Sequence, residues 1–310
     1  MSSESGWRAT AKYLTYRGLA SAMGQLPEPL TKGIVAGVTK TMSWRGGAPL
    51  AMNERHLTRV LGSECVAGVT PDPALVRRWS RRTFGEYGRY WADGARVPYV
   101  NEAMVRSRFM MEQGDEHIRQ GMAAGRGVVM ALPHVGSWEW GGAWLALEGF
   151  PMTAVVERLE PPELFEWFVG QRSQMGLTAV PMGEGSSTAV LRTLKAGGLV
   201  GLVSDRDLAG NGVEVEFFGE RTTLPGGAAT LALRTGAALL PTAVYSGPGN
   251  WHTGVVHPPL DTTRSSSLRA DVQRLTQELA THFERFIVRR PEQWHLYQPN
   301  WPSDRTGEGG

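Results

Sequence analysis

From about residue 100 onward, short apolar runs alternate with longer stretches of helical period. Runs of this length fit buried strands, and the stretches between them fit amphipathic helices. We expect strands at 127–132, 151–156, 199–204, 213–218, 238–245 and 251–256. We expect helices at 138–148, 162–175, 187–197, 226–235 and 266–288. Strands separated by helices predict an α/β fold with a mostly parallel, twisted sheet flanked by helices. The run at 213–218 lies between two glycines and is interpreted as a short hairpin strand.

The first hundred residues show helical patterns instead, at 7–23, 30–42, 52–61 and 74–94. Successive residues of an α-helix are about 100° apart. The second of these helices therefore places five apolar residues within an arc of about 140°: Leu30, Ile34, Val35, Val38 and Met42. Such a face suits a membrane interface and equally suits packing onto the protein's own core. We therefore predict a helical N-terminal region over residues 1–98, continuous with an α/β core over 99–302, and a frayed tail over 303–310.

Charge is unevenly distributed along the chain. Residues 1–100 carry 14 Lys and Arg against 7 Asp and Glu, whereas the whole chain has a net charge of only +2. A basic segment is attracted to anionic lipid, and the excess occurs without a nucleic-acid recognition motif, so we expect no nucleic-acid partner. The single cysteine, Cys65, excludes an intramolecular disulfide and a multi-cysteine zinc site. We expect neither a signal peptide nor a membrane-spanning helix.

One histidine follows a buried strand directly. In the segment from Val128 to Glu139 an apolar run ends at Pro133, His134 comes next, and Ser137 can cap the following helix. Ligands of open α/β sheets bind at the carboxyl ends of the strands. On a continuous helix His134 and Glu139 would be separated by about 140°, so they can meet only if His134 lies in the turn before the helix. A carboxylate bonded to one ring nitrogen would leave the other free to accept a proton.

The alternative interpretation is a structural histidine beside a solvated glutamate, because two-residue patterns arise often by chance. A metal site has less support, since no third ligand stands at a conventional spacing. Arg158, Arg172 and Arg206 are candidates for binding phosphate, for which guanidinium geometry is suited. Surface or structural ion pairs are an equally good interpretation of the three arginines.

The segment Leu132–Glu139 resembles the H-x4-D/E signature of the bacterial lipid A lauroyl/myristoyl acyltransferase family, and most closely its actinobacterial branch, the phosphatidylinositol mannoside acyltransferases. The resemblance continues in order over residues 85–302. Its further blocks are Tyr87–Trp91, Val156–Leu159, Arg172, Ser204–Leu208, Gly212–Glu220, Leu224–Gly227, Thr235–Ala238, Trp294–His295, Gln298–Pro299 and Trp301. Ordered agreement over many blocks is more specific than any one motif.

This resemblance implies transfer of an acyl group, palmitoyl in particular, from acyl-CoA to a mannose hydroxyl of a phosphatidylinositol mannoside. Acyl-CoA would be a co-substrate, and no cofactor is implied. The enzyme would sit peripherally on the anionic surface at the cytoplasmic face of the cell membrane. His134 would be the general base and Glu139 its partner. In the branch a second carboxylate near the histidine is a glutamate; here that position is Asp205, which is one methylene shorter, so its contact with His134 would be lost or bridged by water.

Two other functions stay open on the sequence alone. The acceptor could be another glycolipid or a lysophospholipid, because the matching blocks do not encode the acceptor pocket. The chain could also be a non-catalytic lipid-binding relative, a reading that rests on Asp205 replacing the family's glutamate. The oligomeric state is not encoded in any of these features.

Overall fold

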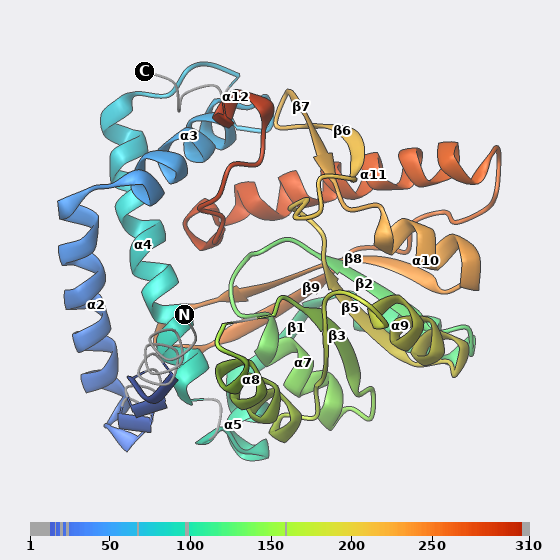
Figure 1. Cartoon of the computed structure of the whole chain (residues 1–310), viewed down its shortest axis with the longest axis horizontal. Coiled ribbons are helices and arrows are strands. Elements are labelled where there is room, and N and C mark those ends of the chain that lie inside the picture. The colour runs from blue at the N-terminus through green and yellow to red at the C-terminus, as the bar shows by residue number, and fades with distance from the viewer. Residues whose placement is uncertain are drawn as a thin grey trace, which may run out of the picture.

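The fold is taken from a computed structural model of the chain, shown in Figure 1. The structure describes residues 13–15, 17, 18, 21, 22, 25–66, 68–96, 99–158 and 160–305. Most of the helix predicted over residues 7–23 therefore lies outside the described residues. Within the described part, no helix combines the length and apolar character needed to cross a bilayer.

A seven-stranded sheet forms the centre of the described molecule (Figure 1). Its strands are, in spatial order, β1 (Phe109–Gln113), β9 (His252–Val256), β8 (Ala238–Ser246), β2 (Val128–Leu132), β5 (Leu199–Val203), β3 (Met152–Val156) and β4 (Thr178–Pro181). Strands β8, β2, β5, β3 and β4 run parallel, whereas β9 pairs antiparallel with β8 and β1 runs parallel to β9. The predicted α/β fold with a mostly parallel sheet flanked by helices is confirmed.

Helices cover both faces of this sheet and create two apolar cores. One core joins the sheet to α9 (Ser186–Lys195), α10 (Gly227–Thr235) and α11 (Leu268–Arg289). The other joins it to α5 (Glu102–Arg108), α6 (Asp115–Ala123) and α7 (Trp138–Leu147). Successive residues of β2 alternate between the cores: Val129 belongs to the first and Met130 to the second. Every residue of β2 is buried, which explains its uninterrupted apolar sequence. Helix α8 (Pro162–Gln174) connects β3 to β4.

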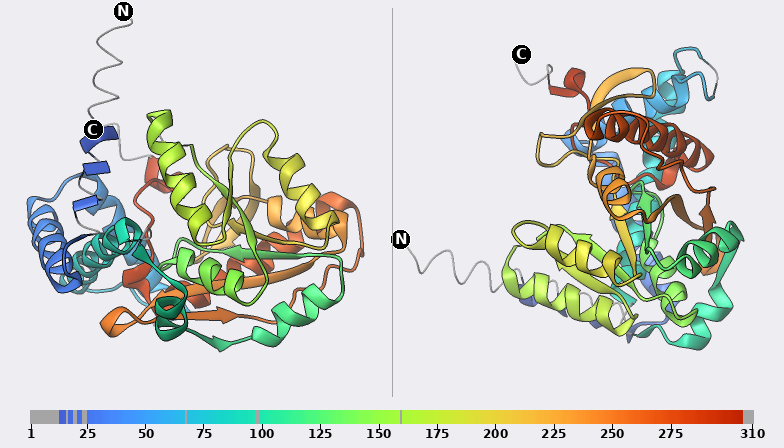
Figure 2. Two further views of the ribbon diagram at one scale, coloured as in Figure 1. Left: turned by 90° about the horizontal axis from the view of Figure 1, so that it is seen from below. Right: turned by 90° about the vertical axis from the view of Figure 1, so that its right-hand side faces the viewer.

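Three N-terminal helices gather at one end of the molecule (Figure 2). They are α2 (Glu28–Arg45), α3 (Ala48–Gly62) and α4 (Pro73–Arg96). Helix α2 packs along α4 (Figure 1), and the close approach depends on Gly88, where a Cβ would lie 2.3 Å from Thr39 Cγ2. The buried residues of α2 are Thr31, Thr39 and Ser43.

The apolar stripe predicted on α2 faces away from the protein core. Val35 is half-buried against α4, but the other four residues of the stripe expose roughly half of their surface: Leu30 50%, Ile34 46%, Val38 54% and Met42 53%. Of the two interpretations that the sequence left open, packing onto the core is therefore wrong for most of this stripe.

The hairpin and the C-terminal tail complete the described chain. Strand β6 (Val213–Phe217) pairs antiparallel with β7 (Glu220–Leu224), as the glycine-flanked run predicted. The tail differs from the expectation, because Pro302–Arg305 form the short helix α12. Asp304 is buried there, where it accepts a hydrogen bond from the ring of His56 and forms an ion pair with Arg59. Residues 306–310 lie outside the description, and the division at residue 98 stays a prediction.

Candidate active site

Two neighbouring strands end beside each other at the carboxyl edge of the sheet. Strands β2 and β5 are paired in parallel with Leu132 opposite Val203, and the Ser204 N–H donates to the Leu132 carbonyl at 2.8 Å. His134 and Asp205 each follow two residues after the end of their strand, so the two residues lie side by side. The register of the two strands, and not the spacing along the chain, brings these residues together.

The His134 ring is bonded directly to the Asp205 carboxylate. The distance from Nδ1 to Oδ1 is 2.5 Å, and the His134 backbone N–H donates to Oδ2 at 2.9 Å. The indole N–H of Trp294 donates to the same Oδ2 at 2.8 Å. Although Asp205 is one methylene shorter than glutamate, it contacts the imidazole without an intervening water.

The surroundings of Asp205 keep its carboxyl ionised. Complete burial alone would raise its pKa, but the charge of His134 and the hydrogen bonds from His134 and Trp294 hold the pKa below the ordinary value. An ionised carboxylate at Oδ1 requires the proton of the neutral imidazole to sit on Nδ1. Nε2 is then left as the basic nitrogen, and it has no hydrogen-bond partner among the described residues. The His134 side chain is 36% exposed, so a substrate hydroxyl can reach it.

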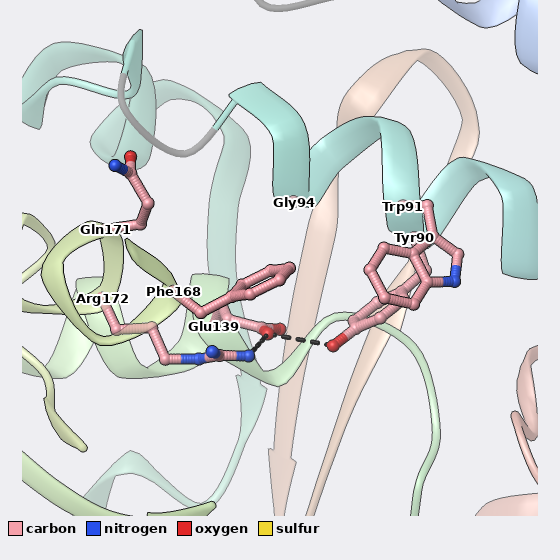
Figure 3. A pocket seen from close by; sticks show the side chains of 7 residues that line it. All are labelled: Tyr90, Trp91, Gly94, Glu139, Phe168, Gln171 and Arg172. Carbon is pink, nitrogen blue, oxygen red and sulfur yellow. Dashed lines mark hydrogen bonds and ion pairs between the residues drawn. The ribbon is translucent and has the colours of Figure 1, made fainter. Parts of the chain in front are cut away.

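Glu139 does not bond to the His134 ring, contrary to the predicted pairing. It lies in the first turn of α7, and its Oε1 accepts hydrogen bonds from the Tyr90 hydroxyl and from Arg172 Nη2, each at 3.0 Å (Figure 3). The side chain is buried, so the guanidinium of Arg172 compensates its charge. His134 does lie in the turn before the helix, as expected, but its ring points to Asp205.

A small cavity is lined on one side by Tyr90, Glu139 and Arg172 (Figure 3). The cavity lies where α4, α7 and α8 meet, and the aromatic rings of Trp91 and Phe168 contribute to its lining. Arg172 also stacks over the rings of Trp138 and Phe168, at 5.3 and 5.5 Å from their centroids. Burial and the neighbouring Glu139 raise the pKa of Tyr90, so its hydroxyl keeps its proton and acts as a donor.

The other two predicted arginines lie after strands β3 and β5. Arg206 forms an ion pair with Glu157 at 2.8 Å, and its side chain is 11% exposed. Arg158 is exposed, and its Nε donates to the Met182 carbonyl at 3.4 Å. Among the described residues Arg158 has no carboxylate partner, which distinguishes it from Arg172 and Arg206.

A C-terminal segment holds the histidine loop from behind. We call residues 293–295 the strap. The His295 N–H donates to the His134 carbonyl at 2.8 Å, the Gly136 N–H donates to the Gln293 carbonyl at 3.0 Å, and Trp294 forms a bridge with Val135. Gly136 has φ of 61°, and a Cβ there would lie 2.0 Å from the Val244 carbonyl oxygen. The tight loop therefore depends on glycine at this position.

Sequence reasoning gave Tyr90, Trp294 and His295 no chemical role, although two of the matching blocks contain them. His295 packs against the rings of Tyr87 and Tyr90. Burial, together with the nearby His134, lowers its pKa to about 3, so this second imidazole is neutral. Within the described chain no group of three or more His, Cys, Asp or Glu side chains is arranged to hold a metal ion.

Comparison with known proteins identifies the relatives of this chain. The family model described as bacterial lipid A biosynthesis acyltransferase matches residues 6–303. A phosphatidylinositol mannoside acyltransferase of Mycobacterium tuberculosis is 38% identical over 264 residues, which cover 84% of this chain and 79% of the relative. The protein of the same name from Mycolicibacterium smegmatis is 35% identical over 286 residues, or 91% and 89% of the two chains. A lipid A biosynthesis acyltransferase of Haemophilus influenzae is 24% identical over 203 residues, or 63% and 61%.

Proposed function

The chain belongs to the bacterial lipid A biosynthesis acyltransferase family, and from this we propose that it transfers a palmitoyl group from acyl-CoA to a mannose hydroxyl of a phosphatidylinositol mannoside. The observation that supports the proposal is the bond between His134 and the buried Asp205 at the carboxyl edge of the sheet. The names of the mycobacterial relatives supply the acceptor class.

The proposed reaction begins at His134 Nε2. This nitrogen removes the proton of the mannose hydroxyl while the hydroxyl oxygen attacks the thioester carbonyl carbon. The tetrahedral intermediate then collapses, the C–S bond breaks, and the imidazolium returns the proton to the departing sulfur. The products are the ester and free CoA thiol. The thioester is already activated, so the chain needs no covalent nucleophile of its own.

Asp205 supports this proton transfer electrostatically. As a carboxylate on Nδ1 it holds the productive tautomer and stabilises the imidazolium that forms during attack. A general base of this kind contributes about a hundred- to ten-thousand-fold to the rate. In place of the direct role predicted from the sequence, we propose that Glu139 positions Arg172 and Tyr90 beside the cavity.

Arg158, Arg172 and Arg206 are proposed to bind substrate phosphate. Arg158 has the strongest case because it is exposed and has no carboxylate partner among the described residues. Arg172 and Arg206 would bind phosphate while they stay paired with Glu139 and Glu157. Guanidinium groups that already hold a carboxylate can still present a second edge to an anion.

The test is a direct assay of the reaction. Purified protein is incubated with palmitoyl-CoA and a phosphatidylinositol mannoside; we expect release of free thiol and a product heavier by one palmitoyl group. His134→Ala should lower thiol release by a hundredfold or more. His117→Ala is the matched control, because His117 lies on α6 and pairs with Glu116. Equal release from wild type and His134→Ala would overturn the mechanism.

The same assay decides the acceptor. Other glycolipids and lysophospholipids are offered separately, and the mass of each product shows which hydroxyl-bearing lipid is acylated. We expect the mannoside to give the highest kcat/KM. A higher value for another lipid would reassign the acceptor while leaving the acyltransferase in place.

We further propose that α2 rests on the membrane at the cytoplasmic face, where acyl-CoA is available. The four exposed residues of its stripe would enter the interface, and the polar residues Thr31, Thr39 and Ser43 stay against the protein. Lys40 and Arg45, both exposed, would meet anionic headgroups at about 1 kcal/mol for each cation.

Vesicle sedimentation tests this contact. We expect the protein to sediment with vesicles that contain anionic phospholipid and to be released by Ile34→Glu with Val38→Glu. Trp251→Glu is the control, because Trp251 is also 50% exposed but lies in the connection between β8 and β9. Identical sedimentation of both variants would show that α2 is not the contact.

A further inference from the structure

Trp294 has an unusual partner for a buried tryptophan of the core. Its side chain is 1% exposed, and its indole N–H donates to Asp205 Oδ2 at 2.8 Å. Nearby, Trp301 is buried to the same degree and donates its indole N–H to the Phe217 carbonyl at 3.1 Å. The two rings lie 6.2 Å apart in one apolar core. A buried indole needs an acceptor, but only that of Trp294 uses the carboxylate that holds His134.

We infer that Trp294 is a positioning residue of the catalytic pair, whose indole N–H fixes Asp205 so that Oδ1 faces the His134 ring. The inference rests on the proposed function. Without the indole, the only donor to Oδ2 left among the described residues is the backbone N–H of His134. The carboxylate would then be freer to rotate away from Nδ1, and the correct tautomer of the imidazole would be held less firmly.

The strap makes this arrangement specific to the site. Its backbone is bonded to the loop of His134 on both sides of Trp294, through His295 and Gln293. The backbone of the strap therefore sets the position of the histidine loop, and the Trp294 side chain sets that of the carboxylate. A displacement of the strap would disturb both members of the pair together.

Removal of the indole donor should also change the basicity of the pair. Whenever the carboxylate keeps its contact with Nδ1, it has one donor fewer and is more basic, so it stabilises the imidazolium more strongly and the acid limb of kcat/KM moves to higher pH. Two other charged or titratable groups lie next to the pair: His295, which burial keeps neutral, and Arg206, which follows Asp205 in the chain and is paired with Glu157. Neither group is altered by a change at Trp294.

The experiment compares Trp294→Phe with Trp301→Phe in the palmitoyl-CoA assay on the full chain. Each variant removes one buried indole N–H and leaves an aromatic ring. For Trp294→Phe we expect kcat to fall on the order of tenfold with KM within about twofold, and the acid limb to move up by about one pH unit. For Trp301→Phe we expect a lower melting temperature, with the acid limb of the wild type.

Two further measurements separate a positioning role from a structural one. In the Asp205→Asn background, Trp294→Phe should change kcat by less than about twofold, because the carboxylate through which it acts is already gone. In wild-type protein labelled with ¹⁵N-tryptophan, the indole resonance of Trp294 should follow the titration of His134 and that of Trp301 should not. The second measurement needs no variant, so it holds even if Trp294→Phe does not fold.

Different results would overturn the proposed function and the positioning role of Trp294. An inactive wild-type protein would overturn the function, while the ¹⁵N titration would still report on the contact between Trp294 and the pair. An active wild type with equal acid limbs in the two phenylalanine variants would overturn the inference alone. Full additivity in the Asp205→Asn background would do the same.

Discussion

Asp205→Asn tests the central feature of the site. The substitution keeps the size of the side chain but removes its charge and replaces one acceptor oxygen with a donor. Asp205 accepts from His134 Nδ1, the His134 backbone and Trp294. An asparagine that still accepts from the last two must turn its amide NH2 toward Nδ1. The imidazole proton then moves to Nε2, the nitrogen that accepts the substrate proton in the proposed reaction.

The expected loss follows from the charge that is removed. Opposite unit charges about 4 Å apart attract by about 4 kcal/mol at an effective dielectric constant of about 20. Loss of that attraction to the imidazolium corresponds to about a thousandfold in rate, since each 1.4 kcal/mol is about tenfold. An Asp-to-Asn change in a Ser-His-Asp triad lowers turnover about ten-thousand-fold by the same change of tautomer. We therefore expect kcat to fall by a factor between about a hundred and ten thousand.

The assay is thiol release from palmitoyl-CoA at saturating acceptor, with kcat and KM determined separately. KM should change little, because Asp205 is completely buried and contacts no solvent. Asp207→Asn is the matched control: Asp207 lies on the same loop but accepts from Gly210, Gly212 and Thr223. A kcat for Asp205→Asn within threefold of the wild type, with both variants folded, would refute the role of the carboxylate.

Three more predictions follow from the neighbouring contacts. Glu139→Gln should lower activity only about tenfold but lower the melting temperature by several degrees, because the half-buried Arg172 loses its carboxylate; a loss as large as that of Asp205→Asn would restore a direct role for Glu139. Burial raises the pKa of Asp93 from 3.8 to about 6, despite the nearby Arg89. The contribution of Asp93 to the free energy of unfolding is therefore fully present below the pKa of the unfolded chain and is lost as the pH rises through about 6. Asp93→Asn should therefore gain about 2 kcal/mol over wild type between pH 4 and pH 8 in denaturant titrations, and a constant difference would contradict this. Gly136→Ala should lose both activity and stability in melting and thiol-release assays, because its Cβ meets the Val244 carbonyl.

Much of the fold could be predicted because its central strands are buried on both faces. Strand β2 appears in the sequence as a continuous apolar run and β8 as a mostly apolar one, and all five residues of β2 are buried. The edge strands β1 and β4 were missed, since their residues are mostly exposed or half-buried and carry no such run. Helix α6 was missed for a similar reason: its sequence is mostly polar, and its buried residues are only Ile118 and Gly121.

The site was predicted less completely because its contacts are long-range. His134 could be located from the strand that precedes it, since the carboxyl ends of strands are where sites form. The carboxylate that bonds to its ring follows a different strand, 71 positions away, and no spacing rule reports that register. Glu139, five positions from His134, looked like the partner, but its own contacts are Tyr90 and Arg172. Only the family resemblance pointed to Asp205.

The position of the main chain at residue 205 lets the short side chain of Asp205 reach His134. The Ser204 N–H is bonded to the Leu132 carbonyl, so the main chain at Asp205 lies beside the loop of His134. One carboxylate oxygen therefore reaches the backbone N–H of His134 while the other reaches the ring. A side chain that contacts both groups at once is fixed in two directions, and Trp294 adds a third. Aspartate at position 205 is thus poor evidence for an inactive relative, because this chain has the contact on which the proposed base depends.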